Sequence, residues 1–260
     1  MTLQFGPDAA RRVETSYLSA DVVAQRRRVL EALRPRPGET AVDIGCGPGL
    51  LSVELAAAVG PEGSVLGTDI SASMLALAEA REIPTGASPL RFAQAGVDAL
   101  PIDDSSADLA VCTQVLEYVA DIPAALTEMH RVLRPDGRLL LLDTDWGSLV
   151  WHSTDVERMR RVCAVWDEHL VDPYLPRTLL GSLQRAGFEV DPPWTIPLLN
   201  VGYHEATYSG GLIPTIQAFV ADRAGLAADE AAAWAADLRA LGPAYFFSLN
   251  RYVFLARRPR

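Results

Sequence analysis

A turn with three alternating glycines is the clearest place for chemistry in this sequence. It runs Asp43-Ile44-Gly45-Cys46-Gly47-Pro48-Gly49. Glycines at this spacing let the chain turn with positive φ and let a ligand approach the bare backbone. An aspartate just before the turn can accept hydrogen bonds from a bound ammonium group. A dinucleotide-binding G-x-G-x-x-G fingerprint would need glycine where Leu50 stands, so the spacing differs from it by one residue.

A second acidic residue, Asp69, stands 20 positions after Gly49 at the end of an apolar run. A carboxylate placed there, at the end of a second strand, can accept both hydroxyls of an adenosine ribose. The alternative is that Asp69 only caps the next helix, a role that Ser71 could fill instead. The glycine turn and the acid together predict a site for a nucleoside cofactor.

Short apolar runs alternate with amphipathic segments, which is typical of an α/β protein. We expect strands at 40–44, 64–69, 90–95, 109–113, 138–143, 188–190 and 245–256, with helices at 50–59, 72–82 and 123–133 between them. Right-handed crossovers then predict a doubly wound, mainly parallel seven-stranded sheet. Its ligand would lie above the carboxyl ends of the strands.

Three segments fall outside this alternation, at about 1–30, 146–176 and 197–243. The second holds an expected helix at 155–170, and the third holds two more at 212–224 and 227–241. We interpret them as a helical cap that shapes a substrate pocket within one domain, 1–260, because long excursions are usually functional. The alternative is that they only pack against the domain or form a dimer surface.

Composition excludes several classes of function. The chain has 260 residues, 49% of them hydrophobic and 22% charged, which predicts a globular domain with a full core. A net charge of −10 disfavours nucleic acids as partners. No apolar run is long enough for a membrane span and no signal peptide is evident, so we expect a cytoplasmic protein, either monomeric or homodimeric. All 23 basic residues are arginines, which excludes Schiff-base chemistry, and the three scattered cysteines predict neither disulfides nor a metal site.

Further motifs follow the glycine turn in order. They are Leu100-Pro101-Ile102-Asp103-Asp104-Ser105-Ser106-Ala107-Asp108, Gln114-Val115-Leu116-Glu117-Tyr118-Val119 and Arg131-Val132-Leu133-Arg134-Pro135-Asp136-Gly137-Arg138. With the turn, they resemble the motifs of class I S-adenosylmethionine-dependent methyltransferases, in the subgroup that includes the ubiquinone and menaquinone biosynthesis enzymes. The resemblance is strong over 40–143, about 40% of the chain. It implies a Rossmann-like methyltransferase fold, S-adenosylmethionine as cofactor and S-adenosylhomocysteine as product.

The resemblance also implies roles for residues. Asp43, Gly45 and Gly47 would hold the methionine part of the cofactor, and Asp69 the ribose. The predicted cofactor residues are completed by Tyr17, Cys46, Ile70, Met74, Gly96, Val97, Asp98 and Gln114. Ile70 and Met74 would pack against adenine, although core burial explains Met74 equally well. Asp98 stands two positions later than the family's adenine-binding aspartate, so either it or the backbone of Gly96 and Val97 would contact the adenine amino group.

Methyl transfer from a sulfonium mainly requires that acceptor, methyl and sulfur be held in line. A general base matters only where the acceptor loses a proton. The family frequently has histidines where this chain has Glu117 and Tyr118, so we choose His152 as the candidate base, against the alternative of an exposed or capping histidine. The predicted substrate pocket is Tyr118, Asp145, Trp146, Tyr203 and His204. The aromatic members equally fit an ordinary core.

We therefore expect a methyltransferase that acts on a small, aromatic or lipophilic acceptor at oxygen, nitrogen or carbon. One alternative is a nicotinamide oxidoreductase, which Leu50 and the absence of a Tyr-x-x-x-Lys pair disfavour. The other is a methyltransferase-fold protein that binds the cofactor without methyl transfer, as a partner protein or for another pocket reaction.

Overall fold

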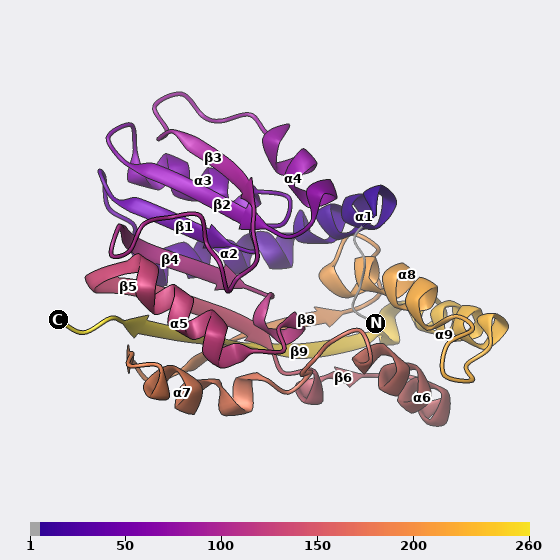
Figure 1. Ribbon diagram of the computed structural model, residues 1–260. Helices are drawn as coiled ribbons and strands as arrows, with labels where there is room; N and C mark the ends of the chain where they lie inside the picture. The colour runs from indigo at the N-terminus through magenta and orange to yellow at the C-terminus, as the bar shows by residue number, and fades with distance from the viewer. Residues whose placement is uncertain (1–5) are drawn as a thin grey trace.

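A single mixed β-sheet forms the centre of the molecule (Figure 1). The computed structural model describes residues 6–260. The strands are β1 (Thr40–Ile44), β2 (Ser64–Asp69), β3 (Leu90–Gln94), β4 (Ala107–Thr113), β5 (Leu133–Thr144), β6 (Val150–Trp151), β7 (Glu189–Val190), β8 (Trp194–Val201) and β9 (Phe246–Arg257). The order β3-β2-β1-β4-β5 is parallel throughout, and β9 lies antiparallel to β5.

The far edge of the sheet is made by β8, which pairs antiparallel with β9 from Trp194 to Val201. The short strands β6 and β7 also pair with β9, at Phe247–Ser248 and Ala256–Arg257 respectively. They therefore extend the lines of β5 and β8, and the sheet has seven strand positions. The predicted doubly wound, seven-stranded fold is confirmed.

Helices cover both faces of the sheet. They are α1 (Pro7–Tyr17), α2 (Ala20–Leu33), α3 (Leu50–Val59), α4 (Ala72–Glu79), α5 (Ile122–Val132), α6 (Val156–Asp167), α7 (Pro176–Arg185), α8 (Tyr208–Val220) and α9 (Ala228–Ala240), with short 3₁₀ turns η1 (Leu116–Tyr118), η2 (Trp146–Ser148) and η3 (Gly242–Ala244). The apolar sides of α2 and α3 pack on one face of the sheet, and those of α5 and α7 on the other. Burial of these sides is the main source of stability for such amphipathic helices.

A third apolar cluster joins α6, α8 and α9 at one end of the sheet (Figure 1). The tryptophans Trp146, Trp151, Trp166 and Trp234 are all buried in it. Trp151 meets Trp234 edge to face, with ring centroids 5.6 Å apart. Most of the predicted cap therefore has an apolar core of its own.

The predicted cap boundary at 197 is wrong, because Pro197–Val201 belong to strand β8. The alternation there is regular: Ile196, Leu198 and Asn200 are buried, and the residues between them are exposed. Pro197 obscured the pattern, since proline lacks a ladder donor. It is tolerated here because β8 is an edge strand.

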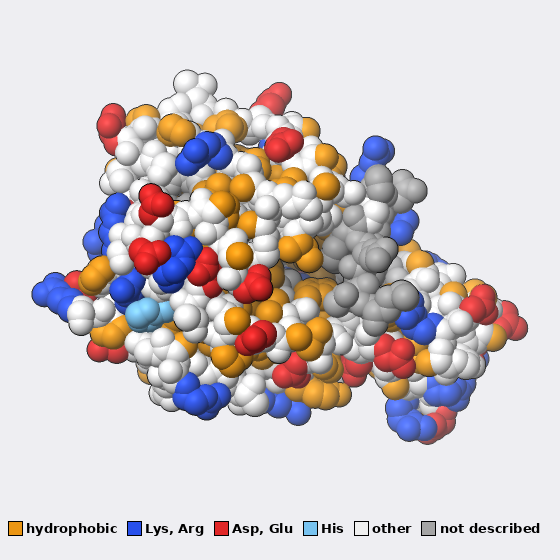
Figure 2. Space-filling view, in the orientation of Figure 1, with side chains coloured by type: hydrophobic (Ala, Val, Ile, Leu, Met, Phe, Trp, Pro, Cys, Tyr) orange, Lys and Arg blue, Asp and Glu red, His pale blue; other side chains and the backbone are white. Residues whose placement is uncertain are grey.

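The described part of the chain, 6–260, contains no helix that is long and apolar enough to cross a bilayer. The face in Figure 2 shows arginine side chains interspersed with aspartate and glutamate. No broad basic surface of the kind that tracks a phosphate backbone is present on this face.

Candidate functional site

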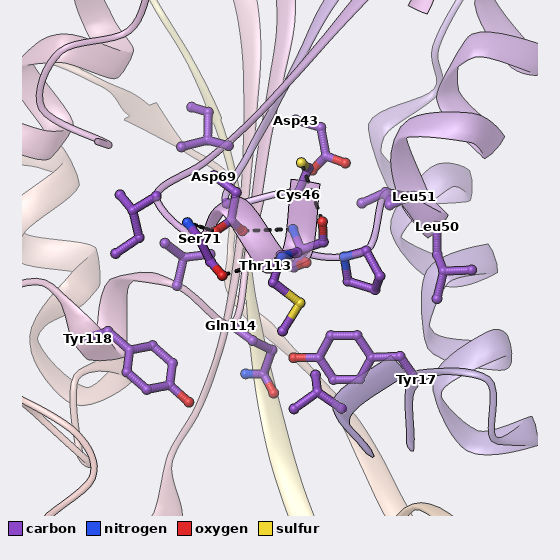
Figure 3. A pocket seen from close by; sticks show the side chains of 18 of the residues that line it. Tyr17, Asp43, Cys46, Leu50, Leu51, Asp69, Ser71, Thr113, Gln114 and Tyr118 are labelled. Atoms are coloured by element: carbon purple, nitrogen blue, oxygen red, sulfur yellow. Dashed lines mark hydrogen bonds between the residues drawn. The ribbon is translucent and has the colours of Figure 1, made fainter. Parts of the chain in front are cut away.

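A cavity of about 630 Å³ opens at the carboxyl ends of β1, β2 and β4 (Figure 3). Its size lies within the roughly 300–1,000 Å³ of small-molecule sites. Ten of the twelve predicted cofactor residues line it: Tyr17, Asp43, Gly45, Cys46, Gly47, Asp69, Ile70, Met74, Val97 and Gln114. The crevice at the carboxyl ends of parallel strands is where ligands of such sheets bind.

The glycine turn between β1 and α3 forms one wall. Gly45, Gly47 and Gly49 have φ of +68°, +52° and +75°, a region that side chains other than glycine rarely adopt. A Cβ on Gly45 would lie 2.2 Å from Cγ2 of Val115, so a side chain there has no room. At Gly47 the space is open. The turn thus leaves bare backbone facing the cavity.

Asp69, at the end of β2, fixes this turn from the side. Its Oδ2 accepts a hydrogen bond from the Gly47 amide at 2.9 Å, and its Oδ1 accepts one from the Ser71 amide at 2.8 Å. Ser71 in turn caps α4, because its Oγ accepts from the Met74 amide at 3.3 Å. Ser71 therefore fills the helix-capping role, and Asp69 faces the cavity. Burial raises the pKa of Asp69 against the opposing effect of these amides.

Asp43 lies deeper, with only 1% of its surface exposed. Its Oδ2 accepts a hydrogen bond from the Ser52 hydroxyl at 2.5 Å. Burial raises the pKa of Asp43 to about 7, with the Ser52 bond as the main opposing effect. A ligand cation nearby would favour the ionised form and lower this pKa again.

The side of the cavity formed by residues that follow β2 and β3 is mainly apolar. Ile70 is 74% exposed at its edge, which is unusual for isoleucine, whereas Met74 is buried. Val97 lines the cavity, but Gly96 and Asp98 do not. The Asp98 side chain is exposed and turned toward Gly96, where a Cβ would lie 2.6 Å from its Oδ1. Of the two alternatives for adenine, this placement favours the backbone near Val97.

The opposite half of the cavity is walled by aromatic and polar side chains. Tyr17 from α1 and Tyr118 from η1 lie on either side of Gln114 (Figure 3). Gln114 follows β4 with φ of +59°, and its Nε2 donates to the Thr144 hydroxyl at 2.8 Å. Burial raises the pKa of both tyrosines, which keeps them as neutral hydrogen-bonding groups.

Two buried carboxyl groups lie behind this half. Asp143 Oδ1 accepts from the amides of Val115 at 3.1 Å and Glu117 at 3.5 Å. Glu117 Oε2 accepts from the Trp146 indole at 3.1 Å. Burial raises the pKa of Glu117 to about 7 and the pKa of Asp143 well above its ordinary value.

The predicted base, His152, does not lie at the cavity. Its side chain is exposed just after β6, and its backbone amide donates to the Phe246 carbonyl at 2.9 Å. The sequence placed it near the site because it follows β5 closely, but η2 and β6 carry the chain away along β9. The placement matches the alternative of an exposed histidine.

Four of the five predicted pocket residues also lie outside the cavity, and only Tyr118 lines it. Asp145 is held by Arg177 in a two-pronged ion pair of 2.8 and 2.9 Å. Trp146 is buried in the cap core. Tyr203 packs on Tyr245, with ring centroids 5.6 Å apart. His204 is exposed, and its Nδ1 accepts a hydrogen bond from the Ala206 amide at 3.1 Å, which stabilises a turn.

Sequence reasoning missed three buried polar residues in the cavity wall, Gln25 and Arg26 from α2 and Arg251 from β9. A signal for Arg251 was present, because a charged residue stands at the centre of a mainly apolar strand. Gln25 carried no such signal, since an amide on a helix with three following arginines predicts a solvated face. No group of three or more His, Cys, Asp or Glu in the described residues could hold a metal.

Comparisons with known proteins find relatives of the part of the chain that contains the glycine turn. Residues 42–141 match the family model described as "Methyltransferase domain". A 39% identity over 109 residues relates the chain to 2-phytyl-1,4-naphtoquinone methyltransferase of a Nostoc species, covering 42% of this chain and 48% of that one. The chain is 37% identical over 198 residues to an uncharacterized 37.1 kDa protein in transposon Tn4556 of Streptomyces fradiae, covering 72% of this chain and 55% of that protein.

Among solved structures, a putative methyltransferase from Bacillus halodurans superposes with a TM-score of 0.65 at 16% identity, covering 91% of this chain and 100% of that one. At that identity the likeness shows the fold alone. The fold, the glycine turn and the family match define a class I methyltransferase domain. Residues 42–141 therefore form a domain of the methyltransferase family, and this region is related to quinone-biosynthesis methyltransferases. The chain spans about half the length of the curated relatives it matches.

Proposed function

We propose that this chain transfers a methyl group from S-adenosylmethionine to a small organic acceptor held in the same cavity. The observation that carries the proposal is the continuity of one cavity from the glycine turn and Asp69 to the wall of Tyr17, Tyr118 and Arg251. One end has the bare backbone and carboxylates that suit a nucleoside with an amino-acid tail. The other end has room and side chains for a second molecule.

The residues present fit this cofactor. The positive φ of Gly45 and the clash that a Cβ would make there leave a backbone cradle. Asp69 faces the same space with a carboxylate, and Asp43 lies beneath it. When bound, S-adenosylmethionine supplies an electrophilic methyl group on a sulfonium.

The protein's own contribution is positioning. Asp69, the glycine turn, Tyr17 and Gln114 would hold the cofactor, and Tyr118 would orient the acceptor. Holding reactants in line is worth roughly 7–11 kcal/mol of a reaction barrier. No histidine lines the cavity among the described residues, so the proposal assigns no histidine base. Acceptors that are already ionised, or that need not lose a proton before attack, suit such a site.

The acceptor is proposed to be flat or lipophilic. Tyr17, Tyr118, Val22 and Val119 give this half of the cavity a mainly apolar lining. The Nostoc relative is named for a naphthoquinone substrate, which is an acceptor of that kind. Whether oxygen, nitrogen or carbon is methylated follows from the acceptor once it is identified.

The proposal is tested by calorimetric titration of the protein with S-adenosylmethionine, S-adenosylhomocysteine and NADH. Asp69→Ala is expected to weaken binding of both sulfur nucleosides by about 10- to 100-fold, because a hydrogen bond to a charged group contributes about 1.5–3 kcal/mol. Glu79→Ala, an exposed carboxyl on α4, is the matched control and should leave affinity unchanged. Preference for NADH would contradict the cofactor assignment.

Methyl transfer itself is tested by incubating the protein with S-adenosylmethionine and aromatic acceptors and following the gain of one methyl group by mass spectrometry. The expected result is a methylated product together with S-adenosylhomocysteine. Tight nucleoside binding with no methylated product across phenols, quinols and aromatic amines would favour the alternative, a cofactor-binding protein without methyl transfer.

A further inference from the structure

Arg251 is an unusual residue for the centre of a sheet. It lies on β9 opposite Thr144 of β5, and only 1% of its surface is exposed. It also lines the cavity, in the half away from the glycine turn. Arginine is almost never this buried unless its charge is paired.

The hydrogen bonds of Arg251 are incomplete within residues 6–260. Its Nη1 donates to Oε1 of Gln25, which is neutral. Its Nε and Nη2 have no hydrogen-bond partner among the described residues. The guanidinium also lies over the ring of Tyr208, 4.6 Å from its centroid. Tyr208 attracts the cation through its ring face and also interacts with the guanidinium through its hydroxyl, but as a neutral group it does not supply an anion.

No carboxylate of the described chain forms an ion pair with Arg251, whereas Arg26 in the same wall is paired with Glu54 at 2.9 Å. Glu117 and Asp143 influence Arg251 only through longer-range electrostatics, and burial raises the pKa of both. The other side chains around it, Gln25 and Tyr208, are neutral. The positive charge therefore lacks a contacting anion, which is costly in a buried position.

The two unpartnered atoms have a specific geometry. Nε and Nη2 form one edge of the planar guanidinium, and this edge matches the two oxygens of a carboxylate. The chain itself provides an example, because Arg177 uses Nε and Nη2 to bind Asp145 at 2.8 and 2.9 Å. At Arg251 the same edge is unused.

We infer that Arg251 binds a carboxylate of a ligand in the cavity through Nε and Nη2. The inference rests on the proposed function and deepens it by naming the chemistry recognised beyond the glycine turn. Two sources supply such a group: a carboxylate on the methyl acceptor, or the carboxylate of the cofactor's amino-acid tail. In both cases the buried guanidinium selects an anionic ligand over a neutral analogue of the same shape.

The first arm of the test compares S-adenosylhomocysteine with 5′-methylthioadenosine, which has the same nucleoside without the amino-acid carboxylate. Both are titrated calorimetrically into the unaltered protein, Arg251→Met and Arg251→Lys. If the cofactor is the source, Arg251→Met binds S-adenosylhomocysteine at least about 10-fold more weakly and 5′-methylthioadenosine equally well, since one charge-assisted contact is lost. Arg251→Lys keeps a cation without the two-pronged edge and should recover part of the loss.

The second arm uses 2-naphthoate and the neutral 2-naphthamide, with and without S-adenosylhomocysteine. If the acceptor is the source, the unaltered protein prefers the naphthoate by about 10-fold or more, and Arg251→Met loses that preference while binding the nucleoside normally. Arg138→Met is the control: this arginine is paired with Glu39 at 2.7 Å and does not line the cavity. It should match the unaltered protein in both arms.

Circular dichroism and thermal unfolding establish whether each variant is folded. If Arg251→Met does not fold, the same comparisons are made with Arg251→Lys. The inference is overturned if Arg251→Met keeps the full affinity for S-adenosylhomocysteine and the unaltered protein does not distinguish naphthoate from naphthamide. Failure of the proposed function has a different signature, because the unaltered protein would then bind neither sulfur nucleoside. The naphthoate arm without nucleoside still decides the role of Arg251 in that case.

Discussion

Backbone geometry, and not the chemistry of a side chain, requires glycine at position 45. Its φ of +68° and the 2.2 Å approach of a Cβ to Val115 act together, whereas at Gly38 only the positive φ of +85° operates and the space is open. A side chain at position 38 therefore causes backbone strain alone, whereas one at position 45 causes both strain and a steric clash. Gly45 lines the cavity, whereas Gly38 lies in the turn before β1 and does not.

We predict that Gly45→Ala lowers the free energy of unfolding by about 2–5 kcal/mol, the sum of left-handed strain and overpacking. Gly38→Ala should lower it by about 1–2 kcal/mol, from strain alone. Chemical denaturation measures both. Gly45→Ala should also lose nucleoside binding in calorimetry, and Gly38→Ala should not. Equal effects of the two substitutions would contradict the role of the Val115 contact.

Glu117 gives a prediction for pH. Burial raises its pKa to about 7, so the folded state keeps this proton to a higher pH than the unfolded chain does. The unfolded state then binds fewer protons between about pH 4.5 and 7, and stability falls as pH rises through that window. The loss in the free energy of unfolding that Glu117 causes across this window is on the order of 3 kcal/mol.

Glu117→Gln is therefore expected to stabilise the unliganded protein relative to the unaltered chain at pH 8 and to show no such gain at pH 4.5. The amide oxygen of glutamine can still accept the Trp146 indole bond. Urea unfolding across this range measures the effect, with Glu168→Gln, an exposed carboxyl, as control. An unchanged slope of stability against pH would show that Glu117 ionises freely in the fold.

At the scale of elements, β8 connects the sheet to the cap. Asn200 is buried on this strand, where its Nδ2 donates to Asp21 of α2 at 3.0 Å and its Oδ1 accepts from the Ser209 amide of α8 at 3.2 Å. The same Asp21 oxygen accepts from the Tyr208 amide at 2.8 Å. One side chain thus ties together three elements that the sequence separates widely.

Asn200→Leu should lower the free energy of unfolding by about 2 kcal/mol, because the half-buried carboxylate of Asp21 and the buried amide of Ser209 each lose a partner. Leu199→Ala, at the adjacent and 56% exposed position, should change it by less than about 0.5 kcal/mol. Thermal unfolding followed by circular dichroism compares the two. Similar losses would mean that the strand, and not the hydrogen bonds of Asn200, determines stability there.

The elements that we propose to bind the cofactor were predictable because their signals are local. Strands β1 and β2, the glycine turn and Asp69 lie within one continuous segment with strict backbone requirements. The far half of the cavity was not predictable in this way. Gln25 and Arg251 meet only through folding, 226 positions apart in sequence. His152 was assigned because it follows β5 closely, but β6 carries the chain away along β9. Tyr203 was assigned because it is an aromatic residue of the expected cap, but it packs on Tyr245.

At the scale of the whole molecule, ligand binding should raise the free energy of unfolding. S-adenosylhomocysteine at 100 times its dissociation constant adds about 2.7 kcal/mol to the folded state. For a chain of this length that corresponds to a rise in Tm of about 5–11 °C. Scanning calorimetry measures the shift, which Asp69→Ala should largely abolish at the same concentration. A shift retained in Asp69→Ala would place the nucleoside elsewhere.

The path of β9 has a consequence for how the protein is made. This strand, close to the carboxyl end of the sequence, pairs with β5, β6, β7 and β8 and brings Arg251 to Gln25. Chains leave the ribosome amino end first, and here the glycine turn emerges some two hundred residues before the strand that completes its cavity. A nascent chain therefore exposes one half of the site before the other half exists, and ligand capture must wait until β9 has been synthesised.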